Sequence, residues 1–279
     1  MAERIVARHD GARRALALLG GLHYLVLAGE AAWDDPLDRH EAFLSDYVAR
    51  QGVQTNEVQR SWVLLPLFLH AAGSVEPVDV VELGASAGLN LAFDRYEYRY
   101  EAGTWGVPDA AVILRGRERR PVPRSLLERP LAVRSRVGID RAPIDVRRED
   151  GARLLESFVW AGQHERMRRL RAAIEAVKDD PPEIVAGDVA EVLPDVLASL
   201  PRDGLTIVFQ TSLFEYIPPE ARASVRATLE GAPGPLVFVA SGSPRGVSRA
   251  WGMRVHRPGQ GYAFVGHADY HGEWLDYDL

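Results

Sequence analysis

The chain has 279 residues, of which 47% are hydrophobic and 26% charged, enough for one large α/β domain or a domain with an added cap. Its formal net charge of −6 makes the protein a poor candidate for binding nucleic acid or a membrane surface. Cysteine is absent, which excludes disulfides, thiolate nucleophiles and thiolate metal sites.

The N-terminal residues lack the apolar core of a signal peptide, and the apolar run from Trp62 to Ala72 is too short to span a bilayer. We therefore expect a cytoplasmic protein. Residues 5–72 show helical periodicity, interrupted at Asp35-Pro36 and at Gly52. This pattern predicts an N-terminal helical cap over residues 1–75, followed by an α/β domain over residues 76–279.

A polar segment leads into the last helix of the predicted cap. Thr55 could cap this helix, and the spacing of Glu57 and Arg60 places them on one helix face. One interpretation is a helix start with a surface ion pair, which would contribute little to stability. The other is that Asn56, Glu57 and Arg60 line a ligand site.

The segment from Val80 to Leu91 predicts a strand, a tight turn and a helix. The apolar strand ends at Glu82, and Gly84 and Gly88 allow positive φ and a close approach of a ligand to the backbone. The N-terminus of the following helix would suit an anionic group. However, Ser86 lies where the dinucleotide motif Gly-x-Gly-x-x-Gly would have another glycine, which disfavours a nicotinamide cofactor.

An insertion follows, over residues 94–134. Tyr96, Tyr98 and Tyr100 alternate with charged residues before several turn residues, which predicts a small antiparallel strand pair. The tyrosines are interpreted as one packed face of this pair rather than a platform for stacking bases. The basic segment 115–124 is interpreted as a solvated loop rather than a phosphate site.

Four further strands are expected at residues 131–140, 183–188, 205–209 and 236–241, with one or two helices over residues 149–178. Asp140 ends the first of these strands and could simply form a turn ahead of Pro143. Asp188 could cap the helix that follows it.

The tail reads as an antiparallel hairpin around Pro258 and Gly259 that completes the sheet. His267, Asp269 and His271 lie close together in this tail. Their surroundings indicate strand and turn rather than helix, and no third ligand is evident, so no metal site is expected.

Two resemblances extend this interpretation. The acid and glycine-rich turn at residues 82–88 resemble the nucleotide-binding motif of Rossmann-like methyltransferases that use S-adenosylmethionine (SAM). Together with the segments at 137–145, 180–182, 187–188 and 271–275, the stretch 82–90 also resembles the bacterial family DUF2332 over essentially the whole chain. The implied fold is a mostly parallel methyltransferase-type sheet with an antiparallel hairpin, a helical cap and a β-rich insertion.

The methyltransferase resemblance implies a role for each candidate residue. Asp140 would accept hydrogen bonds from the ribose hydroxyls and Asp188 would lie beside the adenine. Acceptor and catalytic groups are expected after the fourth strand, and the polar segment before the sheet would contact the substrate. The implied cofactor-binding residues are Glu82, Gly84, Ala85, Ser86, Gly88, Asn90, Asp140 and Asp188; the catalytic candidates are Gln210, Glu215 and Tyr216; the substrate candidates are Asn56, Glu57 and Arg60.

The leading hypothesis is a SAM-dependent methyltransferase that acts on a small molecule. The alternative is a noncatalytic protein of the same fold that binds SAM or a nucleotide, because fold does not determine function. A homodimer is left open. If Gly84 faces the cofactor, Gly84→Val should abolish SAM binding and leave the fold largely intact.

Overall fold

The computed structural model describes residues 13–51, 56–75, 77–242 and 250–279. Contacts divide the chain into two compact units, Met1–Asn56 with Ile144–Lys178 and Glu57–Pro143 with Asp179–Leu279. The helices over residues 149–178 therefore group with the N-terminal helices, whereas the helix at residues 60–72 groups with the sheet. Within the described ranges, no helix is long and apolar enough to cross a membrane.

The first unit is helical in its described part. Its elements are α2 (Arg13–Leu27), η1 (Leu37–His40), α3 (Glu41–Arg50), α6 (Glu149–Ser157) and α7 (His164–Lys178). The core joins apolar side chains of α2 to Leu44 and Val48 of α3. Ser157 at the end of α6 binds both helices, because its carbonyl oxygen lies 3.1 Å from His23 Nδ1 and its hydroxyl 3.1 Å from the Tyr47 hydroxyl. One or two helices were expected over residues 149–178, and the structure has two, α6 and α7.

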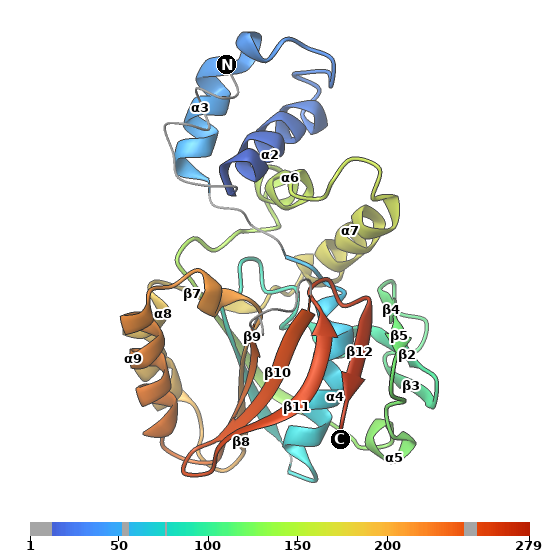
Figure 1. Ribbon diagram of the computed structural model, residues 1–279, viewed down its shortest axis with the longest axis vertical. Coiled ribbons are helices and arrows are strands. Elements are labelled where there is room, and N and C mark those ends of the chain that lie inside the picture. Colours follow the sequence, from blue (N-terminus) through green and yellow to red (C-terminus); the bar gives the residue numbers. More distant parts are fainter. Residues whose placement is uncertain (1–12, 52–55, 76, 243–249) are drawn as a thin grey trace. The chain divides into compact units, whose positions relative to one another are not determined.

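The second unit is built on a nine-stranded, mostly parallel sheet in the order β5-β12-β11-β10-β9-β8-β1-β6-β7 (Figure 1). The five parallel strands are β1 (Val78–Leu83), β6 (Val133–Asp140), β7 (Glu183–Ala186), β8 (Leu205–Gln210) and β9 (Leu236–Gly242). All five were expected from the sequence. In β1, β8 and β9 nearly every residue is buried, and such apolar runs are typical of strands covered on both faces.

The antiparallel extension consists of β10 (Ala250–Arg257), β11 (Gly261–Asp269) and β12 (Trp274–Tyr277). The predicted hairpin is therefore confirmed. However, it does not end the sheet, because β5 (Arg117–Glu118) pairs with β12 and forms the edge. Part of the basic segment 115–124 is thus a strand rather than a loop, held by bonds from the backbone N–H groups of Arg117 and Arg119 to the carbonyl oxygens of Glu273 and Leu275.

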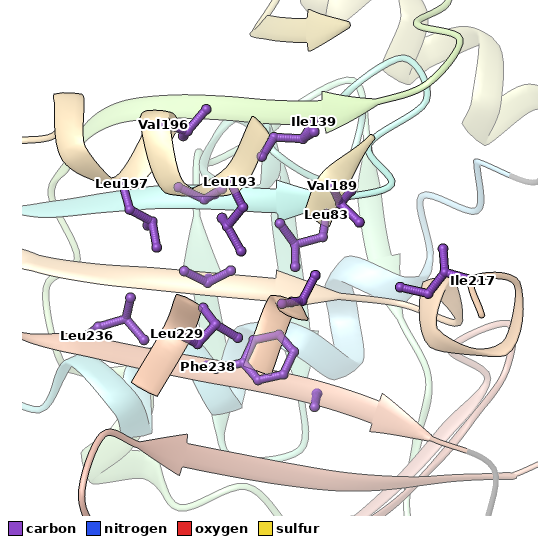
Figure 2. Close-up of a cluster of buried hydrophobic side chains, with 14 residues drawn as sticks. Leu83, Ile139, Val189, Leu193, Val196, Leu197, Ile217, Leu229, Leu236 and Phe238 are labelled. Carbon is purple, nitrogen blue, oxygen red and sulfur yellow. The ribbon is translucent and has the colours of Figure 1, made fainter. Parts of the chain in front are cut away.

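One face of the sheet is covered by α8 (Val189–Ser199) and α9 (Pro219–Glu230) (Figure 1). Figure 2 shows leucines and valines of these helices against the strands, where Leu193 lies near Leu83 and Leu229 near Phe238. The opposite face meets α4 (Arg60–Ala72), whose Phe68 packs edge-on against Phe209 of β8. Successive residues of a strand thus face different helices.

Helix α4 contains a proline in its interior, at Pro66. A proline there removes the N–H that would bond the carbonyl oxygen four residues earlier, on Trp62. The hydroxyl of Tyr100 replaces it, donating to the Trp62 carbonyl oxygen at 2.6 Å, and the hydroxyl of Tyr277 donates to that of Val63 at 2.9 Å. A continuous buried helix is therefore compatible with this proline.

The insertion forms a separate three-stranded sheet, β3-β2-β4, from β2 (Glu97–Tyr100), β3 (Gly103–Gly106) and β4 (Ile113–Arg115), followed by the short helix α5 (Arg124–Leu127). The predicted antiparallel pair is β2 and β3, and β4 adds a parallel strand. Tyr96, Tyr98 and Tyr100 are all buried, so their interpretation as a packed face is confirmed.

Candidate functional site

The order in which successive parallel strands are added to the sheet reverses at β1, with β6 and β7 on one side of it and β8 and β9 on the other. In chain order they are β1, β6, β7, β8 and β9, and in space they run 3-2-1-4-5, so that β1 lies between the second and fourth strands. In open α/β sheets, ligands bind outside the carboxyl ends of the strands at such a switch point. The turns after β1, β6 and β8 are therefore the candidate site, and most of the residues predicted from the sequence lie there.

The turn after β1 has the predicted positive φ values at Gly84 and Gly88 but not the predicted helix. Gly84, Ser86 and Gly88 have φ values of 78°, 56° and 72°, and a serine in this region carries strain of about 1–2 kcal/mol. Residues 84–92 form successive turns that end in the short 3₁₀ helix η2 (Phe93–Arg95). The expected helix N-terminus is absent from this described segment.

Backbone groups in and around this segment are bonded to neighbouring parts of the second unit. The N–H groups of Gly84 and Ala85 donate to the carbonyl oxygen of Ile139 at 2.8 and 3.2 Å. The Tyr96 hydroxyl donates to the carbonyl oxygen of Leu89 at 2.6 Å, and the Tyr98 hydroxyl to that of Phe93 at 2.8 Å. Side chains of the insertion thus donate hydrogen bonds to carbonyl oxygens of this segment.

Asp140 joins the turn after β1 to the turn after β6. One carboxylate oxygen accepts a hydrogen bond from the backbone N–H of Ser86 at 2.8 Å, and the other from that of Ala142 at 2.9 Å. The turn-forming interpretation of Asp140 is therefore confirmed. Each carboxylate oxygen has a second lone pair, so the same side chain can still accept bonds from a ligand.

Glu82, the penultimate residue of β1, is a buried carboxyl on the face of the sheet that α4 covers. Among the described residues, its Oε2 atom has no hydrogen-bond partner. Burial raises the pKa of this carboxyl well above its usual range, and the nearby Asp140 raises it further. The charge of Arg60 and a hydrogen bond from Asn90 both lower this pKa, but by less than burial raises it. Asn90 is in turn oriented by the Ser61 hydroxyl, which donates to its Oδ1 atom at 2.8 Å.

In the turn after β1 and at the end of β8, the buried oxygens Ser86 Oγ and Gln210 Oε1 also have no hydrogen-bond partner among the described residues. Gln210, the last residue of β8, is completely buried and donates through Nε2 to the Ser241 carbonyl oxygen at 2.6 Å. Buried polar atoms in folded proteins usually have partners. The unpartnered oxygens at the ends of β1 and β8 therefore indicate a site for a ligand that donates hydrogen bonds.

The other two catalytic candidates lie in the loop after β8. Ser212, the second residue of this loop, has a φ of 65°, and Leu213–Glu215 form the 3₁₀ helix η3. The side chain of Leu213 packs against Gly84, so the loops after β1 and β8 touch each other. Glu215 and Tyr216 are both exposed, whereas Gln210 is buried.

Asp188 caps α8 as predicted, because one of its carboxylate oxygens accepts from the backbone N–H of Ala190 at 2.8 Å. The other oxygen pairs with Arg141, which follows Asp140 at the end of β6. This pair and the cap together hold the pKa of Asp188 below its usual value. Asp188 is thus near the end of β6, and its role beside an adenine remains a prediction.

Glu57 and Arg60 are buried, so the interpretation as a surface ion pair is wrong. Glu57 accepts a hydrogen bond from the backbone N–H of Gln59 at 3.1 Å, and Arg60 donates to Tyr270 and Thr211. Asn56 belongs to the helical unit. The expected cap at Thr55 lies outside the described residues.

Several residues of this region were not predicted, including Ser61, Thr211, Trp251 and Tyr270. They surround Arg60 or Asn90 but come from α4, the loop after β8, β10 and the turn after β11. No local motif could reveal a set so dispersed along the chain. In the tail, Asp269 accepts from the backbone N–H groups of His271 and Glu273, and the described residues hold no cluster of three or more metal-binding side chains.

A family model described as "Uncharacterized protein conserved in bacteria (DUF2332)" matches residues 1–277. No curated protein matches the chain. The match spans both units and every candidate residue of the site.

Proposed function

Since the chain belongs to the DUF2332 family, as its motifs predicted, and the family description names no activity, we propose a function from the site itself. We propose that the carboxyl ends of β1 and β6 bind SAM and that its methyl group is transferred to a small molecule. The observation that carries this proposal is the set of buried oxygens on Glu82, Ser86 and Gln210 that have no partner in the described part of the chain.

The chemistry of these side chains suits SAM. The ligand carries an ammonium group, a positively charged sulfonium and ribose hydroxyls, all of which interact favourably with hydrogen-bond acceptors or carboxylates. Leaving a buried acceptor without a partner costs about 1–3 kcal/mol. A ligand with several donors would recover part of this cost, and its positive charge would favour the ionised form of Glu82.

The same geometry disfavours a nicotinamide dinucleotide. Dinucleotide-binding folds place the pyrophosphate at the N-terminus of the helix that follows the first strand. Here the residues after β1 are turns and a 3₁₀ helix of three residues. The side chains beside this turn include Asp140, whose negative charge would repel a pyrophosphate.

Each candidate residue has a specific role in this proposal. Asp140 would bind the ribose hydroxyls while it holds the turn through Ser86. Asp188 would lie beside the adenine, and Gly84, Ala85 and Gly88 would form the turn against which the ligand lies. Asn90 acts through Glu82, whose carboxyl it orients.

Methyl transfer needs alignment of the sulfonium with a nucleophile and exclusion of water more than it needs a catalytic triad. Gln210 is the best placed of the three candidates to contact an acceptor, because its unpartnered oxygen is buried at the end of β8. Glu215 or Tyr216 would take a proton from the acceptor if the loop carries them to it.

A second function is favoured by one observation, namely that Glu215 and Tyr216 are exposed. A noncatalytic protein that binds SAM or a nucleotide would need the acceptors at the ends of β1 and β6 but no general base after β8. Single-turnover transfer of a labelled methyl group to a panel of small molecules separates the two functions. Binding without transfer to any acceptor would favour the noncatalytic protein.

Asp140→Asn tests the cofactor site. Asparagine keeps one acceptor oxygen for the turn but loses the negative charge, so we expect the Kd for S-adenosylhomocysteine to rise five- to thirtyfold, equivalent to about 1–2 kcal/mol. Calorimetric titration measures this change. Asp145→Asn is the matched control, because Asp145 also accepts a backbone N–H bond two residues on, at 3.0 Å, but lies in the helical unit. If the two variants bind S-adenosylhomocysteine with equal affinity, Asp140 is not part of the cofactor site.

A further inference from the structure

Two arginines and three aromatic residues form a contiguous cluster on the second unit, outside the set of candidate site residues. The guanidinium carbon of Arg226 in α9 lies 5.5 Å from the ring centroid of Phe214, and the Arg226 side chain also donates a hydrogen bond to the Tyr262 hydroxyl. The guanidinium carbon of Arg254 in β10 lies 5.9 Å from the ring centroid of Phe264, and its charge also interacts with Tyr262. We call these five residues the arginine–aromatic surface.

The strand register places this surface on the face of the sheet that α8 and α9 cover. Arg254 lies opposite Ala240 of β9 and Phe264 of β11, and side chains directly opposite one another share a face. Ala240 belongs to the core beneath α8 and α9. This cover does not extend over β11, because Tyr262 and Phe264 are 43% and 55% exposed. The arginine–aromatic surface therefore continues the sheet face beyond α9 (Figure 1).

Both arginines of this surface retain their charge within the described part of the chain, where neither forms an ion pair. Glu230 lies four residues after Arg226 on α9, but it is bonded to other groups. Its Oε2 atom lies 3.0 Å from His256 Nε2, and its Oε1 atom accepts from the backbone N–H of Gly259 at 2.7 Å. The surface is thus locally positive although the whole chain is acidic.

The composition of this surface is typical of a protein interface. Tyrosine, phenylalanine and arginine are enriched at such interfaces, and tyrosine and arginine often contribute most of the binding energy. Unpaired positive charges favour a partner with negative charges. We propose that the arginine–aromatic surface binds an acidic segment of another protein, whose carboxylates pair with Arg226 and Arg254 and whose apolar side chains pack on Tyr262 and Phe264. This inference goes beyond the proposed function and does not depend on it.

The charges favour this partner over two others. In a twofold contact between two copies of this chain the same surface of each copy meets, so the arginines of both copies would be brought together. A nucleic acid carries a continuous line of phosphates, which would extend from this surface onto a chain with a net charge of −6. An acidic protein segment can confine its negative charge to the arginines.

Fluorescence anisotropy of a labelled peptide of four Glu-Glu-Tyr repeats, titrated with the whole protein, tests the proposal. We expect saturable binding of this peptide and none of a neutral peptide of four Gln-Gln-Tyr repeats. Combining Arg226→Gln with Arg254→Gln should raise the Kd of the acidic peptide at least tenfold, because both cations are removed. Absence of saturable binding, or equal binding of the neutral peptide, would overturn the proposal.

Arg115 and Arg117 provide the matched control, because they are exposed arginines of the same unit. Combining Arg115→Gln with Arg117→Gln changes the net charge by the same amount and should leave the Kd of the acidic peptide unchanged. An increase equal to that of the first double variant would show a general effect of charge and refute a specific surface.

Single variants keep the test decisive if the first double variant does not fold. Arg226 is an exposed residue of α9, so Arg226→Gln should remain folded by circular dichroism and raise the Kd at least threefold. Phe264→Ser should have a similar effect, because the peptide loses the ring on which its apolar side chains pack. An unchanged Kd in either variant would count against the proposal.

Two further measurements identify the other occupants. A dimer in sedimentation equilibrium that dissociates when both arginines are replaced would assign the surface to a second copy of the chain. Tighter binding of a labelled oligonucleotide of twelve thymidines than of the acidic peptide, lost in the same double variant, would assign it to a nucleic acid. Either result would overturn the proposal, whereas a monomer that prefers the acidic peptide would support it.

Discussion

Gly84→Val is expected to lower the free energy of unfolding by about 3 kcal/mol. Gly84 has a φ of 78°, and a residue with a side chain costs about 1–2 kcal/mol in this conformation. A Cβ atom at this position would also lie 3.1 Å from Cδ1 of Leu213, and overpacking of this kind adds about 1–3 kcal/mol. Urea unfolding followed by circular dichroism measures the sum of the two effects.

Gly73→Val separates these two contributions. Gly73 has a φ of 62° at the end of α4, and a Cβ atom there would meet nothing within 4 Å among the described residues. This control should therefore lose only the backbone contribution of about 1–2 kcal/mol. Equal losses for the two variants would show that crowding against Leu213 adds nothing to the cost of a side chain at residue 84.

The contact with Leu213 also changes how a binding defect of Gly84→Val should be interpreted. From the sequence, Gly84 was expected to face a ligand, and valine was expected to leave the fold largely intact. The structure instead places a side chain of the loop after β8 against this glycine. A loss of SAM binding in this variant would therefore follow from a disturbed turn as readily as from a blocked site.

Glu82→Gln is expected to make the protein more stable at neutral pH while it weakens binding of SAM. Burial raises the pKa of Glu82 in the folded protein well above its ordinary value of 4.5, so the unfolded chain loses this proton at a lower pH than the folded one. Between these two pKa values the folded state binds more protons, and stability falls as pH rises. Glutamine removes this pH dependence and keeps the shape of the side chain.

The difference in stability between Glu82→Gln and the unchanged protein should be smallest below pH 4. Above that pH it should grow by up to about 1.4 kcal/mol per pH unit until the folded-state pKa is reached. Urea unfolding at several pH values between 4 and 8 measures this difference. If the difference in the free energy of unfolding does not change with pH, the raised pKa of Glu82 in the folded protein is contradicted.

Glu97→Gln is a control for which the change in stability at neutral pH should have the opposite sign. The hydrogen bond from Arg99 lowers the pKa of the Glu97 carboxyl, so its stabilisation is present above the unfolded-state pKa and is lost as pH falls through the folded-state pKa. This variant should therefore be less stable than the unchanged protein at neutral pH. The two proteins should become similar in stability in acid.

Periodicity and turn chemistry were sufficient to predict much of the fold. The apolar runs at β1, β8 and β9 and the hairpin of β10 and β11 were located correctly, because burial on both faces of a strand leaves a continuous apolar pattern. The cap at Asp188 was also predicted, because it depends only on neighbouring residues.

Features that depend on distant residues could not be predicted. The helix expected after Gly88 is replaced by turns, to which tyrosines of the insertion donate hydrogen bonds at the carbonyl oxygens of Leu89 and Phe93. Local patterns could not show that Arg60 contacts Trp251, since 191 positions separate them. The interpretation of Glu57 and Arg60 as a surface pair failed because their burial depends on strands much later in the chain.

The central claim is that the carboxyl ends of β1 and β6 bind SAM. Calorimetric titration of the purified protein with SAM, S-adenosylhomocysteine and NAD tests it most directly. We expect saturable binding of the first two ligands and none of NAD, with weaker binding in Asp140→Asn. Failure of SAM and S-adenosylhomocysteine to bind to protein that is folded by circular dichroism would contradict the claim, and the methyltransferase assignment would then be abandoned.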